Sequence, residues 1–379
     1  MFIPPRSLLR RSFSGWPRFV SPDEPDDDLF PRPSMTAMDS ALLLSVLLAL
    51  VFGELFEESR YYPWTYDNDL FGGPDFWGLV DKHWTLCSKG KLQSPISIES
   101  SRLAFDPNLK PLQFDKVTVI SKFQNLGQIP VVTIESNDFR WPSPNASSGP
   151  LRPYRYRLDH IQFHFGRDGK MGSEHALDSN RRFPMEIQFI AINTDLYANY
   201  TQASKAPHGM AGISVMVEIG PDTNEELLKI SMATASAPFQ GMEAGLMELK
   251  PWRMLPRTHE YVTYAGSMTA PGCHETVTWI VFNKPIYITP GHLQAWNSLQ
   301  QTPTEEAEPR FISPNYRNLQ ELNQRILRTN INHKIKSVDD KCNTHKITVA
   351  YFSKPKNTSM PRNPHYHHKR RHTGHLHQP

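Results

Sequence analysis

The stretches Asp159–Phe165 (DHIQFHF) and Met185–Ile192 (MEIQFIAI) decide the fold. Both are short, rich in β-branched and aromatic residues, and free of internal glycine and proline, which predicts interior strands of a sheet. In a strand, side chains two positions apart lie on one face, roughly 6.6 Å from each other. Each strand is therefore expected to present a row of side chains on one face: His160, Gln162 and His164 in the first strand, and Glu186, Gln188 and Ile190 in the second.

Further short β-branched runs, bounded by glycine, proline, asparagine or aspartate, predict more strands. They lie at Val117–Ile120, Val131–Glu135, Ile213–Ile219 and Thr276–Phe282. The helices that we expect are few, Thr223–Ala233 and Pro290–Leu299, the second with proline at a helix-start position. We find no internal repeat, so the pattern predicts a β-dominated fold.

Length and charge place few limits on function. The chain has 379 residues, enough for one large domain or two modest ones. Its formal net charge is +3 and 21% of its residues are charged, an ordinary globular balance that gives no reason to expect a nucleic-acid partner.

The N-terminal region is interpreted as a targeting segment preceded by an extension. Residues 1–37 are proline-rich and are expected to be disordered or to lie upstream of the working start codon. The apolar run Ala41–Phe52 is too short to span a membrane comfortably, but it fits the core of a signal peptide over 38–53 with cleavage after Gly53. A secreted, extracellular protein without a stable membrane span is therefore predicted, with an uncleaved signal anchor as the open alternative.

The C-terminal region, 333–379, is expected to be a basic, histidine-rich tail. From Lys354 onward it carries six lysines and arginines and no acid, and six histidines fall in its last fifteen residues. A solvated disordered tail is the simpler interpretation. The more specific interpretation is that the tail contacts anionic cell-surface polymers or binds metal ions opportunistically.

A series of short motifs resembles the α-class carbonic anhydrases. Each motif is weak alone, but together they occur in order and at matching spacing over 61–332. They are Trp64-Thr-Tyr66, Phe76-Trp77-Gly78, Gly90–Ile98 (GKLQSPISI), Gly172–His175 (GSEH), Ser267–Pro271 (SMTAP), Trp279–Val281 and Asn315–Arg325. The resemblance implies a single α-carbonic-anhydrase-like domain with a large central twisted, mostly antiparallel sheet and short surface helices.

The resemblance also locates the zinc ligands of the enzymes, two histidines on one strand and a third on the next. These positions hold Gln162, His164 and Gln188 here. The register is chosen because Arg157-Leu158 upstream and the GSEH motif downstream both match without a gap when His164 takes the second position. An amide oxygen is a poor zinc ligand beside imidazole, so we expect neither a zinc cofactor nor catalysis.

His160 is the candidate substitute for a missing ligand. It lies four residues from His164, roughly 13 Å along an extended strand, so only a bulge or severe bending would let both rings reach one ion. A zinc-dependent hydratase or esterase with such a non-standard ligand set stays open as the alternative to a zinc-free protein.

Other catalytic positions are matched only in part. By resemblance, Thr269 and Glu174 occupy the places of the threonine and glutamate that orient the attacking hydroxide, and without zinc we expect them to form a structural hydrogen bond instead. The proton-shuttle histidine is replaced by Gln128, whose amide does not titrate near neutral pH.

The three cysteines are assigned partly by resemblance. Secreted relatives carry a disulfide at the positions of Cys87 and Cys273, so this pair is predicted here. Cys342 is then left over, and an odd cysteine in a secreted chain indicates a reactive free thiol or an intermolecular bond, to a partner or to a second copy. Glycosylation sequons stand at Asn145, Asn199 and Asn357.

The chain is most similar to the secreted, acatalytic carbonic anhydrase-related proteins, types ten and eleven. Shared features include the Asn199 sequon, the Thr329–Asn332 stretch (TNIN) and a cysteine shortly after it. The N-terminal extension and the histidine-rich tail are departures from that pattern. The resemblance implies a secreted neural glycoprotein that binds neurexin ectodomains. An extracellular scaffold without a specific partner is the remaining alternative.

Overall fold

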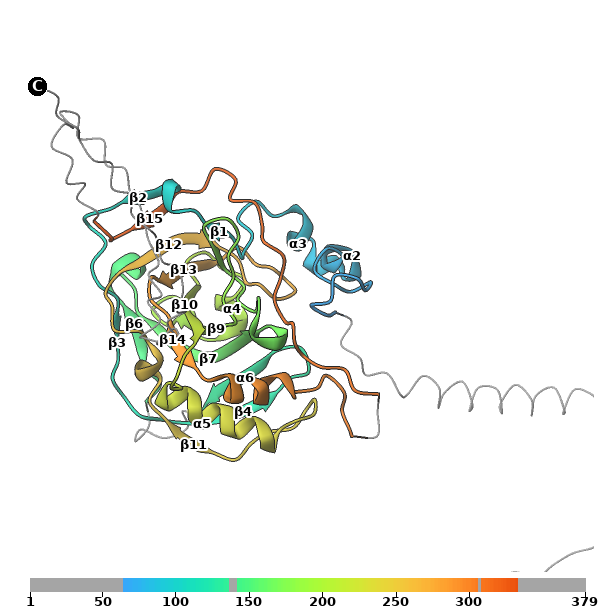
Figure 1. Cartoon of the computed structure of the whole chain (residues 1–379). Helices are drawn as coiled ribbons and strands as arrows, with labels where there is room; N and C mark the ends of the chain where they lie inside the picture. Colours follow the sequence, from blue (N-terminus) through green and yellow to red (C-terminus); the bar gives the residue numbers. More distant parts are fainter. Residues whose placement is uncertain (1–63, 136–141, 306–307, 333–379) are drawn as a thin grey trace, which may run out of the picture. The chain divides into compact units, whose positions relative to one another are not determined.

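The computed structural model describes residues 64–135, 142–305 and 308–332. A large sheet runs through them, with most of its strands in the order β11-β4-β5-β7-β9-β10-β13-β12-β15-β2 (Figure 1). The strands are β1 Ser97–Ile98, β2 Leu103–Phe105, β3 Gln113–Phe114, β4 Val119–Asn125, β5 Pro130–Ile134, β6 Asn145–Ser147, β7 Tyr156–Phe165, β8 Ala176–Leu177, β9 Met185–Asn193, β10 Met210–Ile219, β11 Met247–Leu249, β12 Tyr261–Gly266, β13 Val277–Phe282, β14 Ile286–Ile288 and β15 Leu327–Thr329.

Most neighbouring strands are antiparallel, as the resemblance implies. The exceptions within the large sheet are β10, which pairs in parallel with β13 and β14, and β15, which pairs in parallel with β2. β7 and β9 are interior neighbours, and every residue of β9 is buried. Both faces of these strands are therefore covered, and the polar side chains that they carry are shut away from bulk solvent.

The helices are short, with bounds of α2 Trp77–Val80, α3 Leu86–Lys89, α4 Tyr200–Ala203, α5 Glu225–Ala233 and α6 Pro290–Asn297. Both predicted helices are present. α5 starts after Asn224, whose side-chain oxygen accepts hydrogen bonds from the backbone of the first turn. α6 starts at a proline that follows Thr289, whose hydroxyl accepts from the backbone N–H of His292.

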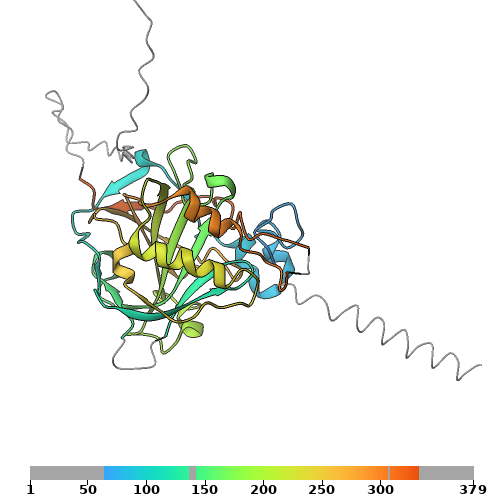
Figure 2. The ribbon, with the colours of Figure 1, turned by 60° about the horizontal axis from the view of Figure 1, so that its bottom comes forward.

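One face of the sheet packs against α5 and α6, which lie across the strands in Figure 2. Trp296 of α6 anchors this core, with ring centroids 4.7 Å from Phe163 and 5.6 Å from Phe165 of β7. Because side chains alternate along a strand, the even-numbered residues of β9, and those of β7 from His160 onward, point to the opposite face. That face holds the histidine and glutamines singled out in the sequence.

Several predicted segments lie outside the described residues: the extension at 1–37, the signal peptide at 38–53 and the tail at 333–379. In the described part of the chain, no helix is long and apolar enough to cross a membrane.

Candidate functional site

The pairing of β7 with β9 brings the three predicted ligand positions together. Gln162 lies directly opposite Gln188, and His164 lies opposite Glu186. Opposed residues have Cβ atoms roughly 4.5–5.5 Å apart, and residues two apart share a face. Gln162, His164 and Gln188 therefore form one cluster on a single face of the sheet.

His160 does not join this cluster as a substitute ligand. β7 contains one irregularity against β9, between Leu158 and His160, and from His160 to His164 the pairing runs without a break. The irregularity thus precedes His160 and leaves its distance from His164 unshortened. The His160 ring instead contacts Asp159 through Nδ1 at 2.8 Å and Gln162 through Nε2 at 2.9 Å.

Hydrogen bonds fix how the two glutamine amides are turned. Gln188 Nε2 donates to Glu186 Oε1 at 3.0 Å and to Glu174 Oε2 at 3.2 Å. Gln162 Nε2 donates to the ring nitrogen of His160. The amide oxygens of both glutamines are buried and have no hydrogen-bond partner within the described structure.

His164 contributes a third buried hydrogen-bond acceptor to the cluster. Its Nδ1 lies 2.7 Å from the carbonyl oxygen of Asn315. A carbonyl oxygen only accepts, so Nδ1 carries the hydrogen and, in the neutral ring, Nε2 is an acceptor. That Nε2 atom is buried without a partner within the described residues. The cluster thus holds three acceptors that other described side chains leave free.

The donor set does not fit the catalytic zinc that the resemblance implies. Such sites use three charged or imidazole ligands, whereas this cluster offers one imidazole nitrogen and two neutral amide oxygens. Glu186 is occupied, since it accepts from His175, Ser214 and Gln188. In the described parts of the chain, no group of three or more histidine, cysteine, aspartate or glutamate side chains is placed to hold a metal ion.

Glu186 is the centre of a buried polar network that the sequence analysis had placed only by its strand face. Burial by itself raises the pKa of this carboxyl, but His175, His164 and the hydrogen bond from Ser214 outweigh burial and lower it to about 2. The network continues from His175 Nε2 to the Tyr264 hydroxyl at 2.7 Å. Glu186 therefore stays ionised and orients its neighbours across the physiological range of pH.

Glu174 and Thr269 are not joined by a hydrogen bond between their side chains in the described structure. The Glu174 carboxylate accepts instead from Gln188 Nε2 and, at 2.9 Å, from the backbone N–H of Arg317. Thr269 offers its carbonyl oxygen to the Tyr66 hydroxyl at 3.4 Å. The expected hydrogen bond between Thr269 and Glu174 is thus replaced by hydrogen bonds from Gln188 and from the backbone of Arg317 to Glu174.

Gln128, at the predicted proton-shuttle position, is buried and makes a structural contact. Its side-chain nitrogen donates to Gln301 Oε1 at 3.3 Å, and its backbone oxygen accepts from Asn315 at 3.3 Å. Asn315 also binds β7, because its side-chain nitrogen donates to the carbonyl oxygen of Phe163 at 3.0 Å. Gln128 is therefore tied to the same segment that orients His164.

The predicted disulfide between Cys87 and Cys273 is present, with an S–S distance of 2.07 Å. Beside it lies Arg317, a buried residue to which the sequence analysis gave no role. Its guanidinium donates to the Cys87 carbonyl oxygen at 2.9 Å and to Gln93 Oε1 at 2.9 Å. Burial lowers the pKa of Arg317 to about 10. The Arg317 side chain and the disulfide both tie the first described segment to the rest of the domain.

The predicted glycosylation sites differ in how exposed they are. Asn199 is exposed and begins α4, where its side-chain oxygen accepts from the backbone of Gln202, leaving the amide nitrogen free for a glycan. Asn145 is half-buried, and its side-chain nitrogen donates to Asp115 at 3.0 Å. Asn357 and Cys342 lie outside the described residues, so their assignments stay predictions.

Comparison with known proteins places the chain in a family. The sequence matches the eukaryotic-type carbonic anhydrase family over residues 72–331. It is 42% identical over 341 residues to carbonic anhydrase-like protein 1 of Caenorhabditis elegans, covering 74% of this chain and 93% of that protein. It is 44% identical over 288 residues to carbonic anhydrase-like protein 2 of the same organism, covering 75% of this chain and 85% of that protein. The chain belongs to the eukaryotic-type carbonic anhydrase family.

Proposed function

We propose that this chain is a catalytically inactive carbonic anhydrase-related protein that acts as an extracellular binding module. The observation that carries the proposal is the donor set of the β7–β9 cluster. Gln162 and Gln188 offer neutral oxygens where zinc requires imidazole, and the hydrogen bonds of their amide nitrogens keep those oxygens pointing into the cluster. One imidazole, from His164, cannot lower the pKa of a bound water to about 7, which zinc-dependent hydration of CO2 requires.

The network around the cluster supports a scaffold role. The glutamine at 188 donates to both Glu174 and Glu186, which a histidine in one orientation would not do with a single ring N–H. The buried carboxylates are therefore hydrogen-bonded by the very residue that removes a zinc ligand. The site thus stabilises the fold in place of holding a reactive ion.

Secretion is proposed from two features that point to an oxidising compartment. The apolar run Ala41–Phe52 has the length of a signal-peptide core. The disulfide between Cys87 and Cys273 is of a kind that persists outside the cytosol. The exposed Asn199 sequon supports a glycoprotein.

The proposed partner is the ectodomain of a neuronal cell-surface receptor such as neurexin. This proposal comes from the resemblance to the type ten and type eleven proteins. Cys342, which is left over once Cys87 and Cys273 are paired, is proposed to form a disulfide with the partner or with a second copy.

The test uses the full-length protein secreted from mammalian cells. After dialysis against a weak chelator, elemental analysis should find zinc well below one ion per chain, and CO2 hydration should not exceed the uncatalysed rate. Stoichiometric zinc with hydration activity would overturn the inactive assignment. A neurexin ectodomain should be captured by the wild type, and the disulfide-linked fraction should vanish with Cys342→Ser. If the wild type does not capture the neurexin ectodomain, the receptor assignment is refuted and the inactive assignment is unaffected.

A further inference from the structure

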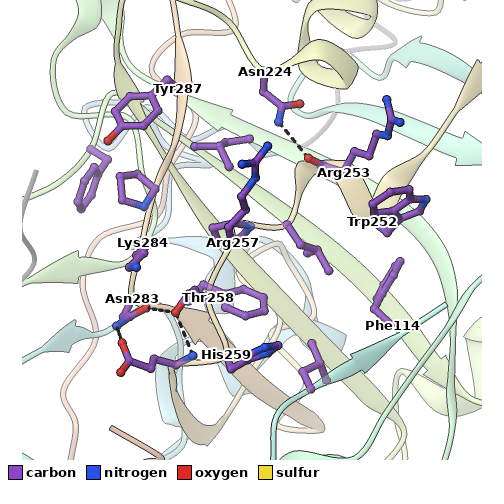
Figure 3. A pocket seen from close by; sticks show the side chains of 18 of the residues that line it. Phe114, Asn224, Trp252, Arg253, Arg257, Thr258, His259, Asn283, Lys284 and Tyr287 are labelled. Carbon is purple, nitrogen blue, oxygen red and sulfur yellow. Dashed lines mark hydrogen bonds between the residues drawn. The ribbon is translucent and has the colours of Figure 1, made fainter. Parts of the chain in front are cut away.

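A groove of about 1490 Å³ lies outside the cluster described above. Its walls come from segments far apart in the sequence: β3, the short 3₁₀ helix Pro251–Met254, the stretch 255–260, and the turn between β13 and β14. Figure 3 shows Trp252 and Phe114 on one side, Lys284 and Tyr287 on the other, and Arg257 between them. None of the ligand, shuttle or disulfide positions lines this groove.

The groove combines apolar surface with unpaired positive charge. Its lining carries five lysines and arginines against three carboxylates, namely Lys116, Arg181, Arg253, Arg257 and Lys284 against Asp222, Glu225 and Glu260. One of the carboxylates is paired with a cation, because Glu225 binds Arg253 at 2.7 Å. Glu260 accepts from the neutral amide of Asn283 at 2.5 Å and keeps its charge, and Asp222 is exposed, so the lining as a whole stays positive.

Arg181 is paired with Glu218 at 3.4 Å, so three cations of the described lining remain without an ion-pair partner. Within the described structure, no ion pair is formed by Lys116, Arg257 or Lys284, and all three are exposed. Lys116 instead lies 5.6 Å from the centre of the Trp252 ring, which Arg253 also approaches at 5.3 Å. The two cations hold the indole in place at the wall of the groove, where its surface remains half-exposed.

The apolar part of the wall decides between two anionic ligands. An anionic glycan would satisfy the cations but would leave the half-buried Phe114 and Leu255 against hydroxyl groups. A peptide segment with both carboxylates and apolar side chains satisfies both parts, since apolar surface is buried while opposite charges meet. Aromatic and arginine side chains are also the residue types that contribute most to protein–protein binding.

We propose that this groove binds an acidic peptide segment that also carries apolar side chains, supplied by a partner protein. The proposal rests on the proposed function of the chain as a binding module and names the chemistry of the partner. The carboxylates contact Lys116, Arg257 and Lys284, and the apolar side chains pack on Trp252 and Phe114. Binding weakens with salt, because the cations are exposed.

The test uses the full secreted protein and a fluorescein-labelled decapeptide of five glutamates, three leucines and two phenylalanines. Fluorescence anisotropy should show saturable binding at low salt and weaker binding at 0.5 M salt. A peptide with glutamine in place of every glutamate should bind at least about tenfold more weakly. No saturable binding of the acidic peptide, or equal binding of both peptides, would overturn the proposal.

Variants assign the binding to the groove. Arg257→Glu with Lys284→Glu turns two attractions into repulsions and should weaken binding about tenfold or more. The matched control is Lys91→Glu with Lys205→Glu, two exposed lysines outside the groove, which should bind as the wild type does. Equal loss in both double variants would refute the location. Binding of a heparin hexasaccharide at the groove without binding of the peptide would replace the peptide by a glycan.

The same preparations separate this proposal from the proposed function. Zinc-free, inactive protein that does not bind the peptide overturns the groove proposal alone. Protein that contains zinc and hydrates CO2, yet binds the peptide through Arg257 and Lys284, overturns the proposed function alone.

Discussion

Changing Gln162 and Gln188 together to histidine should build a three-imidazole site with His164. The register supplies the geometry, because Gln162 lies opposite Gln188 and His164 is two residues along on the same face. Three imidazole nitrogens at about 2.0–2.1 Å from one ion form a familiar zinc site. Glu186 Oε1 accepts from Gln188 Nε2 at 3.0 Å, so it is placed to accept from the ring N–H of a new histidine at 188.

The size of the effect follows from linkage between binding and folding. Zinc that binds only the folded state adds about 4 kcal/mol to its stability when the free ion is at a thousand times Kd. For a domain of this size, each kcal/mol raises Tm by roughly 2–4 °C. The double variant should therefore melt about 8–16 °C higher in zinc than after removal of the metal.

Thermal unfolding by circular dichroism, with and without zinc, measures this shift, and elemental analysis counts the metal. The wild type should show no zinc-dependent shift. Gln202→His with Gln294→His, at two exposed helical glutamines, is the matched control for added histidine. A double variant that folds but neither retains zinc nor shifts in Tm would refute the register. The same Tm rise in the wild type would refute the argument from the donor set.

Three further variants test the buried framework. The pKa of Glu186 is about 2, below its unfolded value near 4.5, so its stabilisation is present above pH 4.5 and is lost as pH falls toward 2. Urea unfolding from pH 6 to 2 should show a loss on the order of 3 kcal/mol in the wild type that Glu186→Gln lacks, and parallel pH profiles would contradict it. Cys87→Ala with Cys273→Ala should lower the unfolding free energy by about 2–4 kcal/mol in urea titrations, and an unchanged midpoint would contradict the role of the disulfide. Trp296→Ala should cost roughly 3–5 kcal/mol in the same assay, because the indole fills the core beneath α5 and α6; a loss below about 1 kcal/mol would show that this core repacks.

Local sequence was enough to predict the helices and strand faces that depend on residues close together in the chain. Proline at a helix-start position predicted the beginning of α6 at Pro290, whereas α5 begins at Glu225, two residues after the predicted Thr223, because Asn224 caps its first turn. The two-residue period placed Gln162 with His164 on one face of β7, and Gln188 with Glu186 on one face of β9, without any knowledge of packing. That Gln188 faces the same cluster was implied by the resemblance and is shown by the pairing of the two strands.

Strand ends were predicted less well, for a physical reason. β10 begins at Met210, three residues before the predicted Ile213, although Ala211 and Gly212 have low strand propensity. Both residues are paired on one side with β9 and on the other with β13. Hydrogen bonds from two neighbouring strands outweighed the local preference there, and only the assembled sheet provides them.

The sequence by itself determined which side chains stand at the ligand positions, and therefore that two of them offer amides. The tertiary structure decided how the Gln188 amide is turned, because Glu174, which accepts from it together with the strand neighbour Glu186, lies in a different segment and reaches β9 only on folding. It also decided the groove, whose Phe114, Trp252 and Lys284 are separated by more than thirty positions each. Such contacts depend on pairing between distant strands, a long-range effect that no local pattern of residues encodes.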